Sequence, residues 1–98
     1  GMGIENYRDI KVGDLILLRA RVTCTFTTSL EVEVEVFSEG TLTGTRQLTS
    51  HAFLTFSAID REGRHLAVPP LLVETDRDRE RCAAAHARRA ERLRQRPR

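Results

Sequence analysis

The sequence predicts an α+β fold, an antiparallel β-meander followed by one C-terminal helix. Apolar and polar residues alternate over three long segments, and glycine-containing turns separate these segments. An alanine- and arginine-rich segment follows the pair Pro69-Pro70. Period-two alternation is typical of strands with one buried face, whereas alanine has the highest helix propensity.

The composition favours one small globular domain. The 98 residues are 40% apolar and 31% charged, which excludes a disordered polymer. No apolar run approaches the roughly 18 residues of a membrane span, and nothing indicates a secretion signal, so we expect a cytoplasmic location. A core this small is marginal and favours oligomerisation. The net charge is +2, and the segment from residue 74 onward contains nine arginines and five acidic residues.

The first predicted strand covers residues 14–26, with alternate residues on one buried face: Ile16, Leu18, Ala20, Val22, Cys24 and Phe26. The second covers residues 29–37, where Leu or Val alternates with Glu and the buried residues are Leu30, Val32, Val34 and Val36. In a hairpin, both apolar sets must share one face, which places Val22 opposite Val32, and Arg21 and Arg19 opposite Glu33 and Glu35. We therefore interpret the glutamate stripe as a solvated, charge-paired surface and not as a catalytic one.

The third strand and the helix complete the fold. Residues 45–59 form the strand after a turn at Gly40 and Gly44, with one face formed by Leu48, Ser50, Ala52, Leu54, Phe56 and Ala58. Thr75 and Asp78 resemble an N-cap box, so a helix should run from about residue 76 into the nineties and fray after Gln95. Its apolar stripe would be Ala83, Ala87, Ala90 and Leu93. We divide the chain into a sheet, 1–73, and an arginine-rich helix and tail, 74–98.

Few side chains are candidates for chemistry. Cys24 and Cys82 lie far apart in the sequence, and we expect free thiols, with Cys24 buried and no metal site. His51 should lie partly exposed on the face opposite Leu54 and Phe56, and His86 should be solvated.

A series of spaced motifs over about residues 4–89 adds a family resemblance. The motifs are Val12-Gly13-Asp14, Thr28-Ser29-Leu30-Glu31-Val32, Thr43-Gly44, the segment AFLTFSAID at 52–60, and Val68-Pro69-Pro70-Leu71. Together they resemble the second half of the acyl-CoA thioesterase (acyl-CoA hydrolase) family of hotdog proteins. The resemblance implies a partial hotdog fold, hydrolysis of fatty acyl-CoA to free acid and CoA, and a homo-oligomer. Coenzyme A would enter as part of the substrate, with no separate cofactor. Its phosphate groups would need Arg or Lys, and the candidates are Arg46, Arg64 and the arginines of the tail.

The resemblance also implies a catalytic segment that this sequence does not match. In the family, a first strand and the central helix precede the segment equivalent to Ile4, and the loop before that helix carries an Asn or Asp. We therefore transfer no catalytic residue, and we interpret Asp9 and Asp14 as non-catalytic. Thr28, Ser29 and Leu30 are predicted by the resemblance to lie at the substrate cleft.

Without a central helix, the apolar face needs another cover. A second chain, the C-terminal helix folded back, or the unmatched segment of the family could supply it. Three functions remain in consideration: an acyl-CoA thioesterase with little activity in these 98 residues, a non-catalytic hotdog module for oligomerisation or acyl-CoA binding, and an unrelated β protein with a nucleic-acid-binding tail. The scarcity of aromatic residues disfavours the last.

Overall fold

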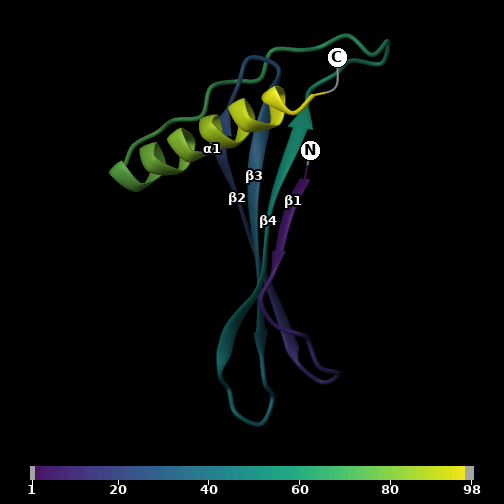
Figure 1. Ribbon diagram of the computed structural model, residues 1–98, viewed down its shortest axis with the longest axis vertical. Coiled ribbons are helices and arrows are strands. Elements are labelled where there is room, and N and C mark those ends of the chain that lie inside the picture. The colour runs from purple at the N-terminus through teal and green to yellow at the C-terminus, as the bar shows by residue number, and fades with distance from the viewer. Residues whose placement is uncertain (1, 97–98) are drawn as a thin grey trace.

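The computed structural model describes residues 2–96 as a four-stranded antiparallel sheet with one helix. The strands are β1 (Met2–Asn6), β2 (Leu15–Thr25), β3 (Ser29–Glu39) and β4 (Arg46–Ser57), in the spatial order β1-β4-β3-β2. Helix α1 (Asp76–Arg94) lies beside one end of the long twisted sheet, and the other end extends well beyond it (Figure 1). The predicted α+β fold is confirmed, and α1 is the only helix within residues 2–96.

The molecule is elongated. Its extents are 49 × 33 × 28 Å and its radius of gyration is 16.4 Å, against roughly 13 Å for a compact domain of similar length. Within the described residues, no helix is long and apolar enough to cross a membrane. The predicted fraying after Gln95 concerns in part residues 97–98, which lie outside the described residues.

The three predicted strands and their register are confirmed. Arg19 pairs with Glu35, Arg21 with Glu33, and Val22 with Val32. The Arg21 guanidinium lies 3.4 Å from a Glu33 oxygen and 3.5 Å from a Glu35 oxygen, so the two strands are cross-linked by charge. Strand β1 was not expected, because five residues that include a glycine give no usable alternation.

A β-bulge in β2 corrects the position predicted for Cys24. The register shifts between Val22 and Cys24, so that Val22 pairs with Val32 but Cys24 pairs with Glu31. One extra residue inverts the alternation of side chains, and Cys24 therefore lies on the face opposite Val22. A similar shift between β3 and β4, after Val36, moves Leu48 away from the face predicted for it.

Helix α1 begins where the sequence predicts, but its packed face differs from the prediction. The Thr75 hydroxyl accepts a hydrogen bond from the Asp78 amide at 3.0 Å, as expected of an N-cap. The predicted alanine stripe, Ala83, Ala87 and Ala90, is exposed. The residues turned toward the sheet are Cys82, Ala85, Arg88 and Arg92. The helix packs on the glutamate-bearing face of the sheet, where arginine side chains find acidic partners that methyl groups cannot provide.

A disulfide joins Cys24 to Cys82, so the expectation of two free thiols is wrong. The two Cα atoms are 4.6 Å apart although 58 positions separate the residues in sequence. The bulge makes this possible, because it turns Cys24 toward α1. Cys24 and Ala85 are the fully buried apolar side chains among the described residues, and the core therefore sits between α1 and β2.

The opposite face of the sheet has no cover within residues 2–96. We call it the apolar face, and its exposed members are Ile4, Ile16, Leu18, Val22 and Phe56. Leu18 is 70% exposed and Phe56 is 52% exposed. Because α1 packs on the other face, the option that the C-terminal helix folds back over these residues is wrong.

Reduction of the Cys24–Cys82 disulfide should destabilise the fold. Closing a loop of 58 residues reduces the conformational entropy of the unfolded chain, and this stabilises the native state by about 4 kcal/mol at most. Urea unfolding with and without a dithiol reductant measures the difference. Cys82→Ser is the matched control, because its unfolding midpoint should not respond to the reductant. An unchanged midpoint in the unsubstituted chain contradicts a stabilising disulfide.

Candidate functional site

A polar groove of ≈ 440 Å³ lies between the ends of β3 and β4 and the last turns of α1. We call it the arginine groove. Its lining combines four hydroxyl side chains, one histidine, one leucine and three arginines: Thr28, Ser29, Thr55, Ser57, His65, Leu93, Arg89, Arg92 and Arg96. The lining residues that the structure describes include no carboxylate.

The hydroxyl groups come from the ends of β3 and β4, except that of Thr28, which lies in the β2–β3 turn. Ser29 pairs with Ser57 where β3 and β4 end, and Thr55 follows on the same face after one intervening residue. The amide of Ala58 donates to the Thr28 carbonyl oxygen at 2.9 Å, which fixes the β2–β3 turn against β4. Strand alternation thus directs these hydroxyls toward α1, whereas their neighbours face the other way.

The cations come from α1. Arg89, Arg92 and Arg96 follow at intervals of three and four residues, which places them on one side of the helix end. The Arg89 guanidinium stacks at 5.1 Å from the centre of the Phe26 ring. Within residues 2–96, none of the three forms an ion pair. The negative end of the helix dipole also lies here, so the guanidinium charges must outweigh it to attract an anion.

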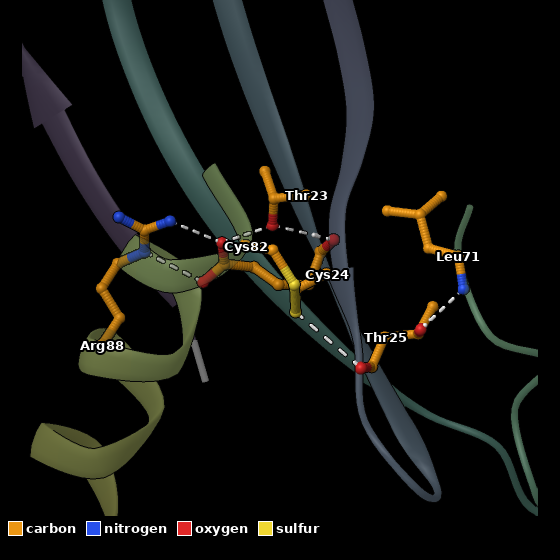
Figure 2. Close-up of a disulfide and its surroundings, with 7 residues drawn as sticks. Thr23, Cys24, Thr25, Leu71, Cys82 and Arg88 are labelled. Atoms are coloured by element: carbon orange, nitrogen blue, oxygen red, sulfur yellow. Dashed lines mark hydrogen bonds and ion pairs between the residues drawn. A yellow bond between two sulfur atoms is a disulfide. The ribbon is translucent and has the colours of Figure 1, made fainter. Parts of the chain in front are cut away.

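The neighbouring ion pair joins Glu31 of β3 to Arg88 of α1. Arg88 donates two hydrogen bonds to the carboxylate, at 3.0 and 2.7 Å, and Thr23 donates a third at 2.6 Å. Figure 2 shows Arg88 and Thr23 converging from the helix and from β2. The Arg88 guanidinium also lies 3.6 Å from the centre of the Phe53 ring. Glu31 is 2% exposed, so the solvated stripe predicted from the sequence is wrong for this residue.

This pairing sets the charge of Glu31. Burial alone would raise the pKa of the Glu31 carboxyl group, but hydrogen bonds from Arg88 and Thr23 and the charges of Arg88 and Arg92 outweigh it. The net result is a pKa below the usual value for glutamate. A carboxylate that is buried and fully hydrogen-bonded is suited to holding α1 in place rather than to accepting a proton near neutral pH.

The structure brings together part of the predicted substrate site. Thr28 and Ser29 line the arginine groove, whereas Leu30 pairs with Phe56 on the apolar face. Their assignment to substrate binding stays a prediction. Asp14 accepts a hydrogen bond from the Lys11 amide at 3.0 Å and closes the turn before β2.

The phosphate-binding candidates are also separated by the fold. Arg46 lies at the far end of the sheet opposite Glu39, and Arg64 bonds to Asp60 and Glu62. Only the arginines of the tail reach the groove. Their spacing of three and four residues was visible in the sequence, but the sequence did not show which strand ends they would face.

The histidines have different surroundings. His51 is partly exposed on the helix-bearing face, as predicted, and its Nε2 lies 2.9 Å from Glu33. His86 is exposed, but its ring packs edge-on against Phe26 with centroids 5.0 Å apart. Candidate ligand atoms of His86, Cys24 and Cys82 lie within 4.8 Å of one another. The interval of four residues from Cys82 to His86 was a signal of this cluster that we did not recognise from the sequence.

Replacing Glu31 by Gln should destabilise the chain by about 2 kcal/mol near neutral pH, because hydrogen bonds to charged groups contribute about 1.5–3 kcal/mol. The folded-state pKa of Glu31 is lowered, so its contribution is present above the unfolded pKa of about 4.5 and disappears as pH falls through the folded value. The difference between the two proteins should therefore shrink in acid. Urea unfolding from pH 7 to pH 3 measures it, with Glu62→Gln in an exposed turn as the control. A difference independent of pH contradicts the assignment.

Comparison with known proteins identifies the family. The thioesterase superfamily model matches residues 2–45. An uncharacterised acyl-CoA thioester hydrolase of Bacillus subtilis is 36% identical over 75 residues, which cover 76% of this chain and 44% of that protein. A crystal structure of an apo-hexameric acyl-CoA thioesterase superposes with a TM-score of 0.85 at 36% identity, covering 94% of this chain and 59% of the other.

A third relative was solved with ligands. The acyl-CoA hydrolase of Staphylococcus aureus, in complex with butyryl-CoA, CoA and CoA disulfide, superposes with a TM-score of 0.75 at 28% identity. The match covers 93% of this chain and 58% of that one. The present chain thus spans roughly half the length of the proteins that it matches. By sequence and by fold, it belongs to the acyl-CoA thioesterase family of hotdog proteins and corresponds to part of their length.

Proposed function

We propose that this chain is part of an acyl-CoA thioesterase and that its arginine groove binds the phosphate groups of CoA. The observation that supports the proposal is the meeting of three guanidinium groups and four hydroxyl groups in one groove whose described lining has no carboxylate. Guanidinium groups bind phosphate oxygens through paired N–H donors, and hydroxyls add further hydrogen bonds. The binding of CoA by the S. aureus relative makes it the first ligand to test.

The arginine groove alone does not supply the groups that hydrolysis of a thioester requires. The reaction to free acid and CoA needs a positioned water, a base and donors for the developing oxyanion. The described lining of the groove offers one histidine, His65, and no carboxylate as a candidate base. We therefore assign CoA binding to the groove and expect little turnover from these 98 residues alone. The alternative is a non-catalytic hotdog module for acyl-CoA binding or oligomerisation. The cytoplasmic location stays a prediction.

Arg96→Glu should weaken CoA binding at least about tenfold, because a charge-assisted hydrogen bond of about 1.5–3 kcal/mol is replaced by repulsion. Titration calorimetry with free CoA measures the affinity, and added salt should weaken it further. The control is Arg77→Glu, which makes the same change of charge near the other end of α1. Equal affinity of the two variants for CoA would show that the groove is not part of the CoA site.

Parallel measurements separate the alternatives. Thiol release from acyl-CoA esters of several chain lengths reports turnover, and several turnovers per second would show that the 98 residues complete a catalytic site. Equally tight binding of single-stranded DNA would instead favour a general polyanion site.

We further propose that the apolar face packs against another copy of the chain. The relative that was solved as a hexamer supports this proposal. Leu18→Lys should then shift the assembly toward the monomer, because it places a charge on an exposed part of that face. Sedimentation equilibrium at micromolar concentration measures the mass. Leu72→Lys is the control, since Leu72 is 80% exposed in a loop. A stable 11.1 kDa monomer of the unsubstituted chain contradicts the proposal.

A further inference from the structure

We propose that Cys24, Cys82 and His86 form a redox-controlled zinc site. In the oxidised chain the two cysteines are joined as a disulfide, and in the reduced chain their thiolates and the His86 imidazole bind one Zn²⁺ ion. This inference does not rest on CoA binding, since none of the three ligands lines the arginine groove.

The three ligands come from two elements that already face each other. Cys82 and His86 are four residues apart on α1, an interval that places both side chains on one side of a helix. Cys24 faces them because the bulge in β2 turns it toward α1. The ligand atoms lie within 4.8 Å of one another. After a small adjustment of the side chains, all three can bind one ion at bond lengths of about 2.0–2.3 Å. Among residues 2–96, no other cluster of at least three such side chains has this property.

The surroundings suit a neutral metal complex. Cys24 is 1% exposed, and the edge-on contact with Phe26 orients the His86 ring. Two thiolates balance the charge of Zn²⁺, so the complex adds no net charge beside the Arg89 guanidinium. Thiolate and imidazole ligands favour zinc over magnesium or calcium, and three protein ligands leave a fourth position for water.

The cavity next to the cluster provides a route for that water. It has a volume of ≈ 560 Å³ and is lined by His86 together with Phe26, Ala67, Val68 and Pro70. Cys24 is buried, Cys82 is half-buried and His86 is exposed, so the His86 ring is the ligand most open to solvent. An ion could enter from this side without displacing α1 from the sheet.

The chemistry balances with an external dithiol as reductant. The dithiol gives two electrons and two protons to the Cys24–Cys82 disulfide, yielding two thiols and one oxidised dithiol. Binding of Zn²⁺ then releases two protons as both thiols become thiolates. A peroxide or another disulfide reverses the process by oxidising the pair and expelling the ion. In a reducing compartment a persistent disulfide is uncommon, and a cysteine pair there more often binds metal or reacts with oxidants.

Cobalt substitution tests the site in the full chain. Anaerobically reduced protein should bind one Co²⁺ with tetrahedral ligand-field bands and a thiolate-to-cobalt charge-transfer band, and Zn²⁺ should remove both. Oxidised protein should show neither. Zn²⁺ should also raise the thermal midpoint of the reduced chain but not of the oxidised chain, because only the folded reduced state offers the complete site.

His86→Ala separates a metal site from a plain disulfide. His86 is exposed, so the variant should fold and form the Cys24–Cys82 disulfide, as thiol counting and mass measurement will show. Its reduced form should bind Zn²⁺ at least about tenfold more weakly, since even outer-shell partners of metal ligands contribute 10–100-fold. His51→Ala is the control, with a half-buried histidine outside both the cluster and the arginine groove, and should bind as the unsubstituted chain does. The proposal fails if the reduced unsubstituted chain binds no Co²⁺ at micromolar concentration, or if His86→Ala binds it equally well.

Discussion

The docking of α1 onto the bulged end of β2 is the constraint on which the described structure depends. The bulge places Cys24 and Glu31 side by side on one face, and α1 meets them with Cys82 and Arg88. One link is covalent and the other is a buried ion pair with two parallel hydrogen bonds. The groove and the thiol–imidazole cluster both need α1 at this height and rotation, because each takes side chains from the helix and from the sheet.

The ion pair has a cost that its surroundings reduce. Removing a carboxylate and a guanidinium from water is unfavourable unless hydrogen bonds replace those lost to solvent. Thr23 supplies an additional donor to Glu31, and the Phe53 ring supports the flat guanidinium of Arg88. Among the described residues, no buried side-chain polar atom lacks a partner. Such a pair fixes the rotation of α1 more narrowly than an alanine stripe would, since alanine methyl groups fit many rotations.

Local pattern was sufficient for the three long strands, for the β2–β3 register as far as Val22 and for the helix start. Alternation of Val with Glu fixed which β3 residues share a face, and Thr75 marked where α1 begins. The local pattern failed where a single extra residue interrupts the two-residue period of a strand. Thr23 adds one position to β2, and from there every side chain points to the face opposite the predicted one. The same error concealed the disulfide and the thiol–imidazole cluster, because both follow from the face on which Cys24 lies.

The types of residue that form the site could be predicted, but not which individual residues meet there. A resemblance to acyl-CoA thioesterases suggested Thr28 and Ser29, and the excess of arginine after residue 74 suggested phosphate contacts, but only the packing of α1 shows which arginines meet those hydroxyls. Leu30 shows the limit of carrying a motif over as a block, since adjacent residues of a strand point to opposite faces.

The elongated shape has a consequence for how much surface the chain leaves in contact with water. Its accessible area is 7517 Å², whereas a compact monomer of 11.1 kDa exposes about 5,700 Å². The excess of this one chain, on the order of 1,800 Å², is about twice the roughly 800 Å² that each partner contributes to a standard stable interface. A single neighbouring surface of ordinary size would therefore cover roughly half of this excess, and the remainder would stay in contact with water.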